Sequence, residues 1–176
     1  MDDDGFLRAT MPVVDLVYHI ARRTVPRRED AEDLVQETYL AAYRAWRERR
    51  RPRKVEPWLA TICLNLARSS YRHRARRPAE NQWDENAPIA APDDPAEEAV
   101  AAIERETVHR ALWELSEEHR LAISLVDLAG LSTAEAAKIL GIPRGTVLSR
   151  LHRGRRALAT ILQHRIHRDR SEEPWS

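Results

Sequence analysis

The sequence predicts an all-α protein built from two small helical domains that are joined by a flexible acidic linker. Long stretches are rich in Ala, Leu, Arg and Glu, and these residues favour helix. Glycine is scarce, with 5 residues in a chain of 176, and period-two alternation of β-branched residues is nearly absent. Charged residues make up 32% of the chain and aromatic residues only 6%, which suits thin helical cores better than a sandwich or a barrel.

The first domain is expected over residues 8–77 and contains three helices in this interpretation. Apolar residues at helical spacing predict a first helix that ends at Pro26, because proline cannot continue a helix. Pro57 suits the N-terminus of the third helix. The expected helices are 11–25, 30–50 and 58–76, with a basic loop over 51–56 between the second and the third.

Residues 78–95 are expected to form the flexible linker. They contain four prolines and many acidic side chains, with little apolar surface to bury. A solubilising spacer and a more specific role are equally good interpretations of this segment. The second domain then covers residues 96–168 as a winged-helix-like arrangement of four helices, the first two expected over 96–115 and 116–129.

The last two helices carry the pattern of a helix-turn-helix. Ser132 and Glu135 have the spacing of a capping box, and Gly141 permits a tight turn before the next helix. Four small or apolar residues of that helix share one face, opposite a short-polar and basic face: Val147, Leu151, Gly154 and Leu158. Such a helix suits the major groove of DNA, and an ordinary solvated amphipathic helix is the alternative. The residues expected to contact DNA are Arg144, Thr146, Ser149, Arg150, His152 and Arg153.

The charge distribution supports contact with a polyanion, although the formal net charge is only +1. Residues 44–77 hold twelve Lys or Arg against two acidic residues, and residues 144–156 form a second basic run. Residues 80–98 lie between them and hold acidic residues without any Lys or Arg. Two basic blocks on either side of an acidic one indicate two polyanion-binding surfaces that are joined by a linker.

The third expected helix combines an aromatic ring, an amide and arginines on one surface. At about 100° per residue, this surface holds Trp58, Asn65, Arg68, Ser69, Arg72 and Arg76. Rings, hydrogen-bonding groups and cations are what single-stranded nucleic acid requires. The alternative is that Trp58 is simply a core residue of the bundle.

The second expected helix has a different surface, both acidic and aromatic. It holds Asp33, Gln36 and Glu37 beside Tyr39 and Tyr43. Because acidic side chains repel DNA, this surface is interpreted as a protein-docking face, with a solvated face as the alternative.

Other function classes find little support. The single cysteine, Cys63, excludes an internal disulfide and a cysteine-based zinc site. The seven histidines lack metal-binding spacing and no catalytic constellation is present, so we expect no metal, no cofactor and no enzymatic activity. The acidic N-terminus is not typical of a signal peptide, and no stretch approaches the roughly 18 apolar residues of a membrane helix. A reduced, cytoplasmic setting is therefore expected.

Three motifs together resemble the extracytoplasmic-function (ECF) class of the sigma-70 family. They are DAEDLVQET at residues 30–38, WLATICLN at 58–65 and GTVLSRLHR at 145–153. The first is similar to the signature of the second conserved region of sigma factors, and the second to its "WLxxIxxN" helix. The third is similar to the "GTVxSRLxRA" helix of the fourth region. The resemblance covers about residues 8–165, with the motifs in the right order.

The resemblance implies a sigma factor that binds core RNA polymerase and directs it to promoters. The first domain would recognise and help to melt the minus-10 element, with Asn65 lining a pocket for a flipped-out base. The face with Asp33, Gln36 and Glu37 would dock on the β′ coiled coil. The second domain would recognise the minus-35 element through Ser149, Arg150 and Arg153 and would pack on the β flap. Many members of the class are held inactive by an anti-sigma factor, which is a further expected partner.

Two positions depart from the family pattern. Leu148 stands where the family often has Arg or Lys, and Gly154 stands where it often has Ala. The first departure puts one minus-35 contact in doubt. Two other functions compete with the resemblance. One is a conventional helix-turn-helix repressor or activator, and the other is a helical adaptor that binds no DNA.

Overall fold

The computed structural model describes residues 3–48, 50–74 and 105–171, and these residues are helical with short connections, as the sequence predicts. The predicted linker over 78–95 and Arg76 lie outside the described residues. The N-terminal half (residues 3–74) contains α1 (Asp3–Thr10), a 3-10 turn (Met11–Val13), α2 (Val14–Thr24), α3 (Arg28–Arg47) and α4 (Val55–Arg74). The C-terminal half (residues 105–171) contains a helix over 105–113, α6 (Glu117–Ile123), a π-helical turn (Ser124–Leu128), α7 (Thr133–Leu140) and α8 (Arg144–Ser171).

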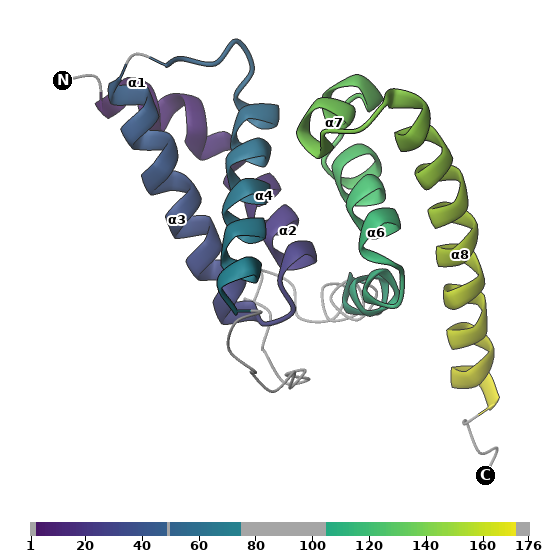
Figure 1. Cartoon of the computed structure of the whole chain (residues 1–176). Helices are drawn as coiled ribbons and strands as arrows, with labels where there is room; N and C mark the ends of the chain where they lie inside the picture. The colour runs from purple at the N-terminus through teal and green to yellow at the C-terminus, as the bar shows by residue number, and fades with distance from the viewer. Residues whose placement is uncertain (1–2, 49, 75–104, 172–176) are drawn as a thin grey trace.

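Helices α2, α3 and α4 pack against one another and form the core of the N-terminal half (Figure 1). Their fully buried side chains include Val17 and Ile20 of α2 and Leu59 and Leu64 of α4. Burial of one such aliphatic side chain stabilises the fold by about 1.5–3 kcal/mol, so several of them together stabilise even a small three-helix core. The three helices occupy the predicted ranges to within a few residues, except that the first begins with the 3-10 turn around Pro12.

Helix α1 precedes these three helices and was not expected from the sequence. Its Phe6 is buried and contacts three aromatic rings of α3 edge-on, with centroid distances of 5.3 Å to Tyr43, 5.8 Å to Trp46 and 6.4 Å to Tyr39. The Tyr39 hydroxyl donates to the backbone carbonyl of Thr10 at 2.8 Å. An aromatic cluster therefore fixes α1 across α3.

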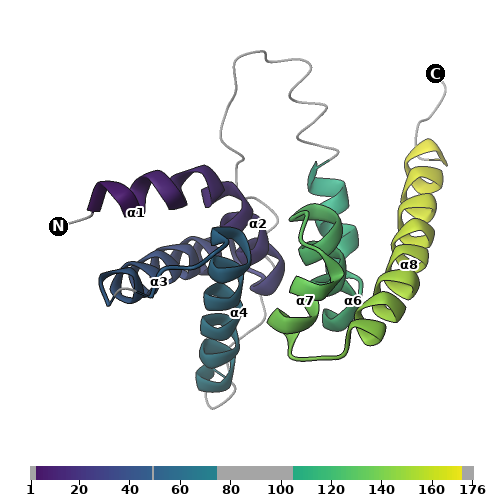
Figure 2. The ribbon, with the colours of Figure 1, turned by 90° about the horizontal axis from the view of Figure 1, so that it is seen from above.

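The C-terminal half is a four-helix unit in which α8 lies along α6 (Figure 2). No strand occurs in the part of this half that the structure describes, so the winged-helix likeness is limited to the helices. Ser116 occupies the predicted N-cap of α6, although its side chain makes no capping hydrogen bond. Gly130 has a φ of 67° and turns the chain after the π-helical turn, as expected of a glycine in the left-handed region.

The two halves are in direct contact, with α4 against α7 and α2 against α6. The most buried polar link is Arg120 of α6, which is only 7% exposed. Its Nε donates to the backbone carbonyl of Arg23 at 3.0 Å, and its guanidinium carbon lies 3.9 Å from the centroid of the Trp113 ring. The cation–π contact stabilises the guanidinium at the place where the two halves meet.

Helix α8 approaches α6 unusually closely at Gly154. A Cβ added to Gly154 would lie 3.0 Å from Cδ1 of Ile123 and 3.1 Å from Cβ of His119. The buried Val147 and Leu151 continue the same stripe, as their spacing predicts. Glycine at this position therefore sets how near the last helix lies to the body of its domain.

None of the helices in the described part of the chain has the length and apolar character needed to cross a membrane.

The close contact at Gly154 leads to a stability prediction. Gly154→Val should lower the free energy of unfolding by about 1–3 kcal/mol, because the added side chain must displace α6. Gly145→Val is the matched control, since a Cβ there meets nothing within 4 Å, and it should stay within about 0.5 kcal/mol of the parent. Urea unfolding followed by circular dichroism measures both, and equal effects at the two glycines would refute the close packing.

Candidate nucleic-acid interface

The turn that orients α8 is held by local hydrogen bonds. The Ser132 hydroxyl accepts from the backbone N–H of Glu135 at 3.2 Å, and the Glu135 carboxylate accepts from the backbone N–H of Ser132 at 2.9 Å. This is the predicted capping box of α7. Gly141 ends α7 with a φ of 67°, and the Pro143 carbonyl then accepts from the N–H groups of Thr146 and Val147. The sequence from 132 to 147 therefore folds as the predicted helix-turn-helix.

Helix α8 presents a polar and basic surface away from its buried stripe, and this surface holds most of the predicted DNA contacts. Arg144, His152 and Arg153 are exposed, whereas Thr146 and Ser149 are half-buried. Arg144 Nε donates to the Thr133 hydroxyl at 2.8 Å, which ties the start of α8 to α7. Leu148 and Arg156 are also exposed on this helix, although neither is among the predicted DNA contacts. We call the exposed surface of α8 from Arg144 to Arg156 the α8 face.

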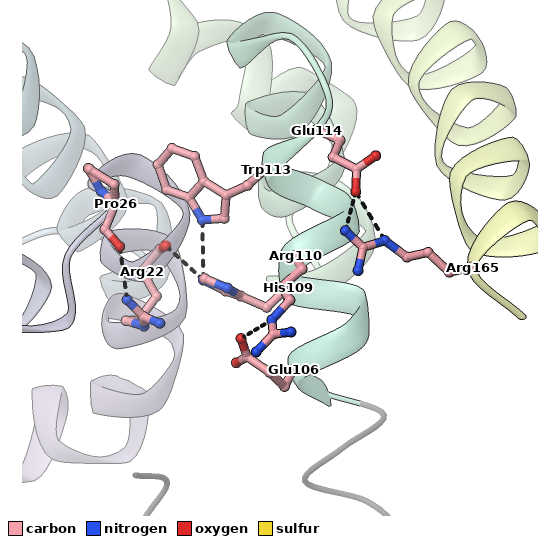
Figure 3. Close-up of polar contacts among 8 residues, drawn as sticks. All are labelled: Arg22, Pro26, Glu106, His109, Arg110, Trp113, Glu114 and Arg165. Carbon is pink, nitrogen blue, oxygen red and sulfur yellow. Dashed lines mark hydrogen bonds and ion pairs between the residues drawn. The ribbon is translucent and has the colours of Figure 1, made fainter. Parts of the chain in front are cut away.

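Arg150 differs from the other predicted DNA contacts. Its guanidinium forms an ion pair with Glu118 of α6 at 2.8 Å, and its side chain is only 21% exposed. Two further ion pairs hold α8 to the rest of its domain, from Arg155 to Asp127 and from Arg165 to Glu114 (the latter in Figure 3). Arg150 is thus tied to α6 in this structure, a contact that spacing alone could not reveal, and its contact with DNA stays a prediction.

Helix α4 presents the second predicted nucleic-acid surface. Asn65, Arg68 and Ser69 are exposed along α4. Trp58 is half-buried and packs against the core, while its part in a nucleic-acid surface stays a prediction. The backbone of Arg72 lies in α4, while its side chain is outside the described residues. The structure thus places Asn65, Arg68 and Ser69 together on the exposed side of α4.

The predicted docking face on α3 divides into two parts. Asp33, Gln36 and Glu37 are exposed, and the neighbouring Leu40 has 56% of its surface exposed. Tyr39 and Tyr43 instead face α1, where the Tyr43 hydroxyl donates to the Asp3 carboxylate at 2.8 Å. Burial raises the pKa of Tyr39 to about 12. The contact of the tyrosines with α1 was not predicted because α1 itself was not, and their part in docking stays a prediction.

The interface between the halves brings cationic groups together. His109 Nε2 lies 3.1 Å from the backbone carbonyl of Arg22 and 3.3 Å from Nε1 of Trp113 (Figure 3). The carbonyl can only accept and the indole N–H can only donate, so Nε2 makes the first contact as a hydrogen bond when it carries the proton and the second when it does not. Burial lowers the pKa of His109 below its ordinary value and lowers the pKa of Arg23 to about 10. The charged forms of both residues are thus disfavoured while the halves are packed together.

One ion pair joins the loop before α4 to the helix-turn-helix. Lys54 Nζ lies 2.7 Å from Oε1 of Glu135, the residue that also completes the capping box. The hydrogen bond from Lys54, followed by those from Ser132, lowers the pKa of Glu135 to about 2. The Glu135 carboxylate therefore takes part both in the N-cap of α7 and in the contact between the two halves.

Comparisons with known proteins find similarity to sigma factors in both halves of the chain. The family model for sigma-70 region 2 matches residues 11–77, and the model for sigma-70 region 4 matches residues 105–158. The ECF RNA polymerase sigma factor SigM of Mycobacterium tuberculosis is 35% identical over 146 residues, which cover 83% of this chain and 71% of the relative. The ECF RNA polymerase sigma-E factor of Escherichia coli K12 is 34% identical over 161 residues, which cover 86% and 83%.

Another relative, the ECF sigma factor SigE of Mycolicibacterium smegmatis, is 37% identical over 84% of this chain, and the match spans 58% of that relative's length. Among solved structures, the sigma factor RpoE of Bartonella quintana in complex with the anti-sigma factor NepR matches with a TM-score of 0.75 and 27% identity. The match covers 90% of this chain and 97% of that one. The similarity therefore extends over both halves of the chain.

The Lys54–Glu135 pair leads to a prediction of pH dependence. Because the pKa of Glu135 is depressed in the fold, its contribution to stability is complete above about pH 4.5 and declines as pH falls toward 2. Glu135→Gln keeps a capping-box residue but removes this carboxylate, so its melting temperature should fall less steeply below pH 4.5 than that of the parent.

Thermal unfolding between pH 2.5 and 7 tests this difference, with Lys54→Met as the matched variant. Lys54→Met keeps the capping box and removes only the link between the halves, so it should give an intermediate slope. If the melting temperatures of the parent and of Glu135→Gln fall in parallel as pH is lowered, the stabilising role given to the Glu135 carboxylate is contradicted.

Proposed function

Because this chain belongs to the ECF class of the sigma-70 family of RNA polymerase sigma factors, we propose that it binds core RNA polymerase and directs it to minus-35 and minus-10 promoter elements. The observation that carries the proposal is the α8 face, a basic and exposed surface on a helix that a capped helix-turn-helix orients. Reconstitution of the chain with core polymerase and sequencing of the run-off transcripts tests it. Failure to initiate at any promoter of the source genome would refute it.

The minus-35 element is assigned to the α8 face. Arg144 and Arg153 are exposed and can neutralise phosphates, while Ser149 and His152 offer hydrogen-bonding groups to base edges. Arg150 remains a candidate for a DNA contact, although Glu118 holds its guanidinium in this structure. The α8 face is supported from behind by the buried Val147 and Leu151, so the groups in front keep a fixed spacing.

The minus-10 element is assigned to α4. Asn65 and Ser69 are exposed beside Arg68, which suits a surface that holds an unstacked base and the adjoining phosphate. Trp58 supports the start of this helix from the core and keeps part of its ring accessible. Arg72 and Arg76 remain candidates for further contacts on the same surface, from the sequence pattern alone. Capture of an unpaired base would favour strand opening, because the captured base can no longer re-pair.

Docking on the polymerase is assigned to the exposed side of α3. Asp33, Gln36 and Glu37 supply acceptors and negative charge, and the exposed Leu40 supplies an apolar contact at the same surface. The β′ coiled coil is the proposed partner of this face, and the β flap is the proposed partner of the C-terminal half. Tyr39 and Tyr43 lie at the edge of this face, where their hydroxyls donate to Thr10 and Asp3 of α1.

The contact between the two halves must break when both elements are bound. The elements are named for positions 25 base pairs apart, which is about 85 Å of duplex at about 3.4 Å per base pair. In the structure α4 contacts α7, and Lys54 lies 2.7 Å from Glu135. Both surfaces cannot reach their elements in that arrangement, so the halves separate on the polymerase. An anti-sigma factor that favours the packed arrangement would keep the chain inactive.

In this proposal the chemistry of RNA synthesis belongs to the polymerase, in the cytoplasm. The chain itself supplies binding free energy: phosphate contacts for affinity, base contacts for position along the duplex, and capture of an unpaired base for opening.

Removal of a single arginine from the α8 face should weaken promoter binding. Arg153→Ala should cost about 1–3 kcal/mol if the guanidinium contacts a base. If it contacts a phosphate, the slope of log affinity against log salt should become shallower by about 0.9. Arg155→Ala is the control on the same helix, because Asp127 holds that guanidinium, and the slope should stay near the parent's. Fluorescence anisotropy of the holoenzyme on promoter DNA measures both, and parent-like binding by Arg153→Ala would count against the α8 face.

Asn65 should act in opening rather than in closed-complex binding. Asn65→Ala should reduce permanganate reactivity of unpaired thymines at the minus-10 element by more than it reduces binding of the closed complex. Arg68→Ala is the comparison, since loss of a phosphate contact weakens both steps. If Asn65→Ala reduces strand opening and closed-complex binding equally, the assignment of Asn65 to a pocket for an unpaired base is contradicted.

A further inference from the structure

The α8 face carries one large apolar side chain that the fold does not use. Leu148 has 49% of its surface exposed, whereas the neighbouring Val147 and Leu151 are 0% and 3% exposed. Those two residues belong to the buried core cluster and Leu148 does not, so Leu148 contributes little to the core. Its side chain instead points to the same side of α8 as Arg144 and His152, which lie one helical turn before and after it and are exposed.

The surroundings of Leu148 indicate what covers it. Arg144 and His152 flank it on the helix, both are exposed, and the basic Arg144 favours a polyanion. Within the major groove of DNA, the apolar group presented at a base edge is the 5-methyl group of thymine. A basic side chain at this position would instead donate to guanine, which is the opposite preference.

We propose that Leu148 makes the chain select a thymine in the minus-35 element by packing against the thymine methyl group. The inference rests on the proposed function of the α8 face and names one of its specificity determinants. It also gives a reason for the departure at this position from the Arg or Lys that the family often has. The cost of exposing leucine in the free chain is offset when the duplex covers it.

The thymine methyl group can be removed without any other change by replacing thymine with deoxyuracil. The test starts from promoter sequences enriched from random DNA by holoenzyme reconstituted from core polymerase and the full chain. Each thymine of the minus-35 element, on either strand, is then replaced in turn, and holoenzyme affinity is measured. At one position the parent should lose affinity about fourfold, which corresponds to the burial of one methyl group.

The variants decide whether Leu148 is the cause. Leu148→Ala should bind the thymine and deoxyuracil duplexes equally well, and Leu148→Arg should enrich guanine at that position. Leu128→Ala is the matched control, because Leu128 is 47% exposed but lies in the π-helical turn rather than on α8, and it should keep the parent's discrimination.

Three outcomes would overturn the inference. One is equal affinity of the parent for thymine and deoxyuracil at every position, and another is discrimination that persists in Leu148→Ala. Loss of polymerase or protein binding in Leu148→Ala with unchanged DNA discrimination would show that a protein covers this side chain. If the parent holoenzyme enriches no sequence at all, the proposed function fails together with the inference, and that result is distinguishable from the others.

Discussion

The close contact between α8 and α6 at Gly154 is the constraint on which the DNA-binding half depends. A Cβ there would come within 3.0 Å of Ile123 and 3.1 Å of His119, so only glycine allows α8 to lie this near without a shift of its neighbours. Because successive residues of a helix are about 100° apart, a rotation of α8 by one residue would turn the buried stripe about 100° away from α6 and re-aim the polar surface by the same angle. Glycine, the apolar stripe and the ion pairs along α8 thus determine which side chains DNA can reach.

The contact between the two halves has a different character. Its polar links are Arg120 and His109, which contact backbone carbonyls, and the pair of Lys54 with Glu135, while buried apolar side chains of both halves belong to one hydrophobic cluster. Burial lowers the pKa of both Arg120 and His109, so desolvation of their charged forms opposes the packing. Exposed ion pairs add little, typically up to about 1 kcal/mol. The polar links therefore add little, and the shared apolar packing is the main contribution that separation of the halves would have to overcome.

The sequence predicted the features that local chemistry determines, and it failed where the partner is distant. The capping box at Ser132, the turn at Gly141 and the stripe of Val147 and Leu151 follow from spacing alone, and all of them are present. The helix around Phe6 was missed because its stability comes from rings more than 30 residues later in the chain, and its contact with the tyrosines of α3 was missed with it. The ion pair of Arg150 was not foreseen because its partner, Glu118, lies on another helix. Contacts between distant residues are what a periodicity analysis cannot supply.

The central claim is that two surfaces of one chain hold two separate promoter elements, and site-directed DNA cleavage tests it most directly. His152→Cys and Arg68→Cys place a thiol on the exposed surfaces of α8 and α4, while the native Cys63 is fully buried with its pKa raised to about 11, and therefore reacts slowly. Each variant is coupled to an iron chelate and assembled with core polymerase on promoter DNA. The account predicts cleavage near the minus-35 element from position 152 and near the minus-10 element from position 68. Cleavage of one common region from both positions, or no cleavage from position 152, would contradict it.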